Sequence, residues 1–107
     1  MGRSFTPTRH VILNLTAEEA ERLLPILEEL TPDDVLRLLP GDADARNALA
    51  IGRVTKRLGQ GANKLTIYEA RNLTELLVAL EGRANTSGIL SRLGVELARQ
   101  GGAKVGR

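Results

Sequence analysis

The feature that most constrains the fold of this sequence is a repeated signal for the start of a helix. Glu19 follows Thr16 by three residues, and Glu69 follows Thr66 in the same way. In such a capping box, the threonine hydroxyl and the glutamate carboxylate accept hydrogen bonds from backbone N–H groups that the first helical turn leaves unpaired. Leucines at helical spacing come after both pairs. The chain is therefore predicted to be mostly α-helical.

Prolines, glycines and acidic residues predict the remaining helix boundaries. Thr31 is followed by Pro32 and two aspartates, a combination typical of the first turn of a helix. Pro25 lies inside the first predicted helix, where it removes one backbone hydrogen bond and predicts a kink or a break. Four or five helices are expected, over about 17–30 and 32–39, from Asp42 or Asp44 to 58, from Thr66 to 81, and from Asn85 or Thr86 to 100.

Residues 10–15 form the one convincing strand of the sequence, because Val11, Leu13 and Leu15 fall on one side of an extended chain. A strand must pair, either within the chain or with the same strand of a second copy, which would make a homodimer. Residues 64–69 are a second candidate strand, although the capping box at Thr66 favours a helix start. The expected fold is four or five short helices around an aliphatic core, with one short N-terminal strand.

The composition limits the domain organisation and the kind of site. The 107 residues suit one helical domain, which we place at 10–100, with flexible basic segments at 1–9 and 101–107. Because the chain has no cysteine and one histidine, we expect no catalytic residue, metal site or cofactor. Two aromatic residues, Phe5 and Tyr68, disfavour recognition of bases by stacking. Without a recognisable membrane span or secretion signal, we expect a cytoplasmic protein.

Charge is sorted along the chain into an acidic and a basic segment. Residues 10–45 carry nine acidic residues and two arginines, whereas residues 46–64 carry five basic residues and no acidic one. A basic stripe on a helix suits the phosphate backbone of DNA or RNA. We therefore predict a small, non-enzymatic, nucleic-acid-binding regulatory protein. Its phosphate contacts are predicted at Arg46, Arg53, Lys56, Arg57 and Lys64.

The acidic segment supports an alternative function. Acids on the first two predicted helices could dock a basic protein partner, making the chain a helical interaction module such as a regulator, an inhibitor or an assembly subunit. The residues of this acidic face are Glu18, Glu21, Glu28, Asp33 and Asp34. A third explanation needs no partner, because the basic residues would simply be solvated and pair with the acids of the first two helices.

Two DNA-binding geometries fit the sequence in part. Residues 10–15 could pair with their twin and present His10, Ile12 and Asn14 to the major groove, although isoleucine is a poor reader of base edges. A helix-turn-helix over 76–95 would leave too few residues for a recognition helix. A single helix from Thr86 to Gln100 is the simpler prediction for that region.

Overall fold

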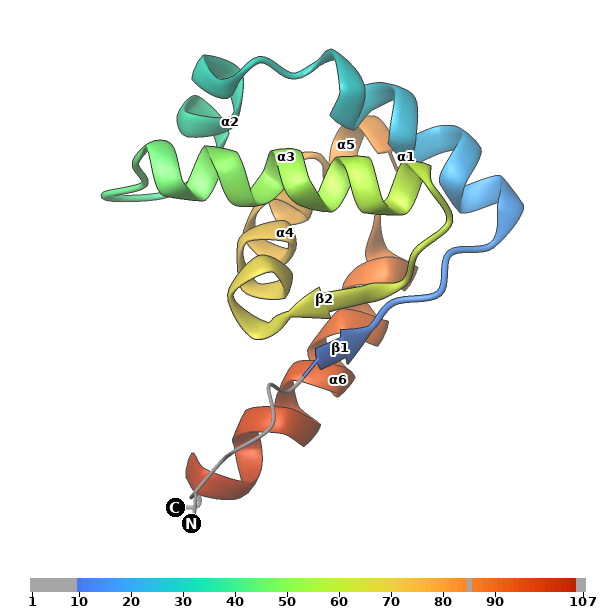
Figure 1. Ribbon diagram of the computed structural model, residues 1–107, viewed down its shortest axis with the longest axis vertical. Coiled ribbons are helices and arrows are strands. Elements are labelled where there is room, and N and C mark those ends of the chain that lie inside the picture. The colour runs from blue at the N-terminus through green and yellow to red at the C-terminus, as the bar shows by residue number, and fades with distance from the viewer. Residues whose placement is uncertain (1–9, 85, 106–107) are drawn as a thin grey trace, which may run out of the picture.

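The computed structural model describes residues 10–84 and 86–105, and this part of the chain forms one short antiparallel ribbon and six helices (Figure 1). The ribbon consists of β1 (His10–Ile12) and β2 (Lys64–Thr66), with Val11 opposite Leu65. The N-terminal strand therefore pairs within the chain. Both structures considered for residues 64–69 are present, because β2 ends where the next helix begins.

The helices confirm the prediction of a mostly helical fold with a short N-terminal strand. Their bounds are α1 (Ala17–Glu29), α2 (Pro32–Leu38), α3 (Ala45–Gly59), α4 (Ile67–Ala79), α5 (Glu81–Ala84) and α6 (Ser87–Val105). The single-turn α5 was not predicted. The predicted basic arm at 1–9 and the last two residues of the predicted tail, 106–107, lie outside the described residues.

Two helices run further than the sequence indicates. α1 continues through Pro25 without a break, because Leu23 before the proline and Leu27 after it are both buried in the core. Packing of these two leucines offsets the one backbone hydrogen bond that proline removes. α6 continues past Gly101-Gly102, where it was expected to end. Each glycine weakens a helix by about 1 kcal/mol, but neither one blocks helical backbone angles.

The predicted capping boxes are present at the start of α1 and α4. The Thr16 hydroxyl accepts a hydrogen bond from the Glu19 N–H, and the Glu19 carboxylate accepts one from the Thr16 N–H, both at 3.0 Å. Thr66 and Glu69 form the same pair of bonds, at 2.9 and 3.0 Å. α2 begins with a third box of this kind. Local hydrogen bonding therefore fixes where these three helices start.

The core is aliphatic and is centred on α4. This helix packs against α3 and α6 and also contacts α2, α5 and both strands. Its residues Leu73, Leu76 and Leu77 are fully buried. Figure 1 shows α1 and α2 along one side of α3, with α4 and the ribbon on the other. One long face of α3 is left exposed to solvent.

Candidate nucleic-acid interface

The two faces of α3 differ in polarity, and this difference places the predicted basic residues. One face carries apolar residues such as Ile51 and Val54, which are buried in the core. The other carries Arg46, Arg53, Lys56 and the half-buried Arg57. Lys64 is exposed on β2, which contacts α4 and β1. Helical periodicity therefore gathers four of the five predicted residues on one helix.

Glu69 of α4 pairs with two of these basic residues, Arg53 and Arg57, and its side chain is 2% exposed. Its carboxylate accepts hydrogen bonds from Arg53 Nε at 3.2 Å, from Arg57 Nη1, and from the backbone N–H of Thr66 at 2.9 Å. Burial raises the pKa of Glu69, but the Thr66 N–H and the two guanidinium groups outweigh burial and lower its pKa from the ordinary value of 4.5. The carboxylate is therefore ionised at neutral pH and balances one of the two arginine charges.

The remaining basic residues keep most of their charge accessible to solvent. Arg46 Nη2 lies 3.2 Å from Asp44 Oδ2, and the Arg46 side chain is 83% exposed. This hydrogen bond lowers the pKa of Asp44 and raises the pKa of Arg46. Lys56 and Lys64 form no ion pair with any residue that the structure describes. The five cations and the two carboxylates paired with them, together the basic surface, carry a net charge of +3, and Asp42 adds one further carboxylate beside Arg46 and Arg53.

The acids of the first two helices do not neutralise this surface, so the third explanation is wrong about the partners. Asp44 precedes α3, and Glu69 belongs to α4. Within the described ranges, the acids of α1 and α2 that form ion pairs do so with other arginines. These pairs are Glu18–Arg22, Glu19–Arg92 and Asp34–Arg37. The ion pairs of the described residues therefore do not join α3 to the acids of α1 and α2, although Asp44, the last acid of the acidic segment, pairs with Arg46.

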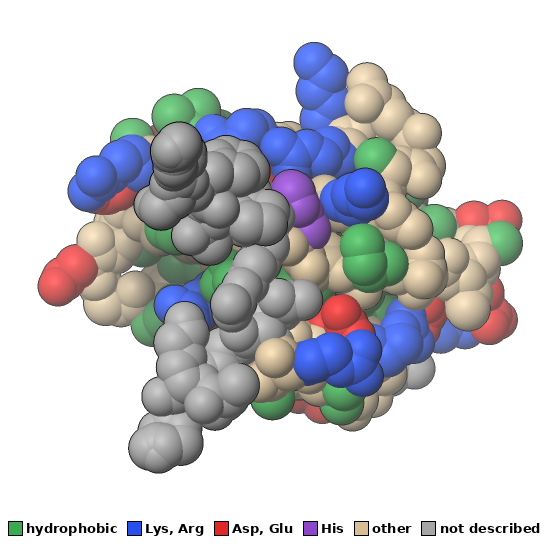
Figure 2. Space-filling model, turned by 60° about the horizontal axis from the view of Figure 1, so that its bottom comes forward, with side chains coloured by type: hydrophobic (Ala, Val, Ile, Leu, Met, Phe, Trp, Pro, Cys, Tyr) green, Lys and Arg blue, Asp and Glu red, His purple; other side chains and the backbone are tan. Residues whose placement is uncertain are grey.

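The outer side of the ribbon extends the basic surface. Figure 2 shows Lys and Arg side chains on several sides of the single histidine, His10. Ile12 at the end of β1 and Asn14 just beyond it are both exposed, whereas Leu13 between them is buried, as alternation along an extended chain requires. The Asn14 side-chain oxygen accepts a hydrogen bond from Asn63 Nδ2 at 2.7 Å. His10, Ile12 and Asn14 are thus exposed in the single chain, and their pairing with a twin strand stays a prediction.

The residues of the alternative, acidic face lie on a different surface. Glu18, Glu21 and Glu28 are exposed on α1. Asp33 and Asp34 occupy the first turn of α2, where Asp34 accepts hydrogen bonds from the Thr31 N–H and from Arg37. The Thr31 N–H and Arg37 lower the pKa of Asp34. Part of this acidic set therefore stabilises the start of a helix.

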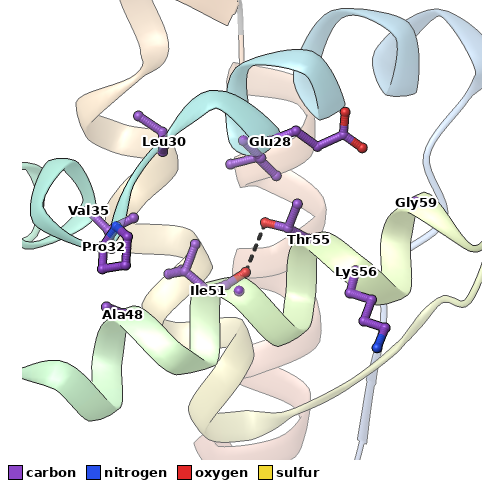
Figure 3. Close-up of a pocket in the computed structure, with 11 residues that line it drawn as sticks. Glu28, Leu30, Pro32, Val35, Ala48, Ile51, Thr55, Lys56 and Gly59 are labelled. Carbon is purple, nitrogen blue, oxygen red and sulfur yellow. Dashed lines mark hydrogen bonds between the residues drawn. The ribbon is translucent and has the colours of Figure 1, made fainter.

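A groove of about 500 Å³ lies between this acidic surface and α3 (Figure 3). Leu27, Val35 and Ile51 give it an apolar lining, and Glu28 and Lys56 border it. Gly52 also lines the groove, and a Cβ built there would meet nothing within 4 Å. The groove therefore combines apolar lining with charges of both signs.

Comparison with known proteins gives no relative: no family model matches the chain, and no curated protein or solved structure matches it at a significant level. Across the described residues, no three His, Cys, Asp or Glu side chains are placed to hold a metal ion. In the same part of the chain, no helix has the length and apolar character needed to cross a membrane.

Proposed function

We propose that this chain is a small, non-enzymatic regulatory protein that binds the phosphate backbone of a nucleic acid through α3 and β2. The contacts are made by Arg46, Arg53, Lys56, Arg57 and Lys64. The observation that carries the proposal is the charge of this surface, where five exposed or half-exposed cations share two carboxylates. Cationic side chains displace the counterions condensed on a nucleic acid, and that release drives binding.

The proposal predicts a definite salt dependence. With three to five phosphate contacts, the affinity for duplex DNA should fall about 40- to 500-fold between about 50 and 200 mM salt. Fluorescence anisotropy with a mixed-sequence DNA duplex and a matching RNA measures this slope. Absence of binding to both at the lowest salt would contradict the proposal.

The variants must reverse charge without disturbing the fold. Arg53 and Arg57 are unsuitable, because their replacement would leave the buried Glu69 carboxylate without partners. Lys56→Glu with Lys64→Glu changes two exposed cations that form no ion pair with the described residues, and we expect it to abolish binding at about 100 mM salt.

Arg22→Glu with Arg83→Glu is the matched control for the lysine variant. It changes the net charge by the same amount on α1 and α5, which lie outside the basic surface. We expect this control to weaken binding much less, because its charges do not contact the phosphates. Equal losses for the two double variants would place the binding surface elsewhere.

The groove beside α3 favours a second function, docking of a basic amphipathic helix. Apolar residues of such a partner would fill the groove, and its cations would meet the acidic face at Glu18, Glu21 and Glu28. A synthetic leucine- and lysine-rich helical peptide is the probe. Glu18→Lys with Glu21→Lys should abolish peptide binding and leave nucleic-acid binding intact. If the peptide binds this variant as tightly as the wild type, docking at the acidic face is excluded.

A homodimer through residues 10–15 stays a prediction. β2 occupies one edge of β1, and the sheet has two strands in the described part of the chain. A second copy would therefore add to the other edge of β1. Light scattering across a concentration series measures the oligomeric state. The cytoplasmic location also stays a prediction.

A further inference from the structure

The basic surface contains an exposed aromatic residue, Tyr68, in the first turn of α4. Its side chain is 46% exposed, although aromatic residues bury more apolar area than most side chains. Tyr68 lines two hollows, one of about 550 Å³ towards α3 and one of about 320 Å³ towards the loop between α2 and α3. The ring is therefore accessible from two directions, and the core does not use it.

The larger hollow combines chemical groups that suit a nucleotide. Arg46 and Arg53 line it together with Tyr68, so cations lie beside the ring. Leu49, which is 62% exposed, adds apolar surface on α3. Two carboxylates line the same hollow: Asp44 pairs with Arg46, and Asp42 is a hydrogen-bond acceptor suited to the N–H groups of a base. An aromatic face, an apolar wall, cations and an acceptor are thus present in one site.

We propose that this hollow binds an unpaired nucleobase stacked on Tyr68, while Arg46 and Arg53 contact the adjoining phosphates. The inference rests on the proposed function, because the phosphate contacts supply most of the affinity. A base can stack on a protein ring only when its own face is free, so the surface selects single-stranded over duplex nucleic acid. From the sequence, the scarcity of aromatic residues argued against recognition of bases by stacking. The structure places the single tyrosine where one base can be bound.

The number of aromatic residues sets the size of the effect. With one stacking ring in the hollow, one base gains a partner, and the preference for a single strand over a duplex is about tenfold. Binding must therefore be measured at matched length, so that the phosphate contributions are comparable. The preference should persist as salt is raised, because stacking releases no counterions.

Intrinsic fluorescence gives a direct test, since the chain has one tyrosine and no tryptophan. We would titrate the protein with a short oligothymidine strand, with an abasic strand of the same length, and with a duplex. The oligothymidine should quench Tyr68 emission, and the abasic strand should bind through its phosphates without quenching. Free tyrosine amide corrects for absorption by the DNA. Equal quenching by the oligothymidine and abasic strands would overturn the inference.

Substitutions provide a second, independent readout by anisotropy. Tyr68→Phe keeps the stacking face and should retain affinity for the single strand, whereas Tyr68→Ala should lose about tenfold for the single strand and less than about twofold for the duplex. Val78→Ala, at another exposed position on α4, is the matched control. If Tyr68→Ala weakens binding to the single strand and to the duplex equally, stacking on Tyr68 is refuted. The proposed phosphate contacts would not be refuted by that result. Absence of binding to every nucleic acid, including the abasic strand, would refute the proposed function as well.

Discussion

Replacing Glu69 with glutamine tests whether a buried charge holds α3 against α4. The glutamine amide has nearly the same shape, and its oxygen can still accept the hydrogen bond from the Thr66 N–H. It cannot provide the negative charge that Arg53 and Arg57 share. The substitution therefore separates the charge of this side chain from its role in the capping box.

The magnitude follows from the exposure of the partners. Hydrogen bonds to charged groups contribute about 1.5–3 kcal/mol when they are buried. Here Arg53 and Arg57 are 52% and 35% exposed, so water screens the interaction and the contribution is smaller. We expect Glu69→Gln to lower the free energy of unfolding by about 1–2 kcal/mol. The midpoint of thermal unfolding should fall by roughly 5–15 °C.

The pH dependence gives the sign of the electrostatic contribution. Because the pKa of Glu69 is lowered on folding, its charge stabilises the folded state above the unfolded pKa of about 4.5, and this contribution is lost as the pH falls through the folded pKa. Urea unfolding between pH 7 and pH 3 should therefore show a constant gap between wild type and variant at neutral pH, and a closing gap below about pH 4.5. Other carboxylates with lowered pKa values, such as Glu19, affect both proteins equally.

Two results would refute this reasoning. A stability gap that stays the same down to pH 3 would mean that shape, and not charge, explains the effect. No change in stability at pH 7 would mean that Arg53 and Arg57 gain as much from water as from Glu69. Glu75→Gln, at an exposed position on the same helix, is the control and should change stability little.

Four further substitutions test the fold by urea unfolding. Gly61 has a φ of +84°, so Gly61→Ala should destabilise by about 1–2 kcal/mol, whereas Gly59→Ala in α3 should be neutral or stabilising by up to about 1 kcal/mol. Thr86→Val removes the hydrogen bond from a buried hydroxyl to the Leu77 carbonyl, 2.9 Å long, and should lower stability by about 1 kcal/mol. Leu73→Ala leaves a cavity in the core and should destabilise by about 2–5 kcal/mol.

The parts of the fold that depend on local chemistry could be predicted from the sequence. A threonine and an acid three residues later accept hydrogen bonds from N–H groups at the start of a helix. Three helix starts can therefore be recognised in the sequence without knowledge of tertiary contacts. β2 has three residues, too few for an alternating pattern, and it exists because β1 lies beside it. The course of α1 through Pro25 likewise depends on packing of leucines on either side.

The candidate interface likewise depends partly on local sequence patterns and partly on tertiary contacts. Helical spacing predicts that the arginines of α3 share a face, and the structure places them there. Their shared partner could not be predicted, because Glu69 lies 16 residues from Arg53 and 12 from Arg57, and their contact depends on how α3 crosses α4. Glu69 is recognisable in the sequence only as a capping residue. The position of Tyr68 beside the arginines depends on the same crossing.

Removal of the Glu69 charge should change two properties in opposite directions: the stability of the fold should fall, and the positive charge of the basic surface should rise. Glu69→Gln removes one negative charge, which raises the net charge of the basic surface from +3 to +4 while the fold loses stability. If α3 binds phosphates, the variant should bind nucleic acid more tightly at low salt, and its salt dependence should steepen by at most about 0.9 in the logarithmic slope. Anisotropy well below the unfolding temperature measures both quantities. Weaker binding by this less stable variant would mean that Arg53 and Arg57 need Glu69 to hold them in place. Tighter binding would mean that their positive charge suffices.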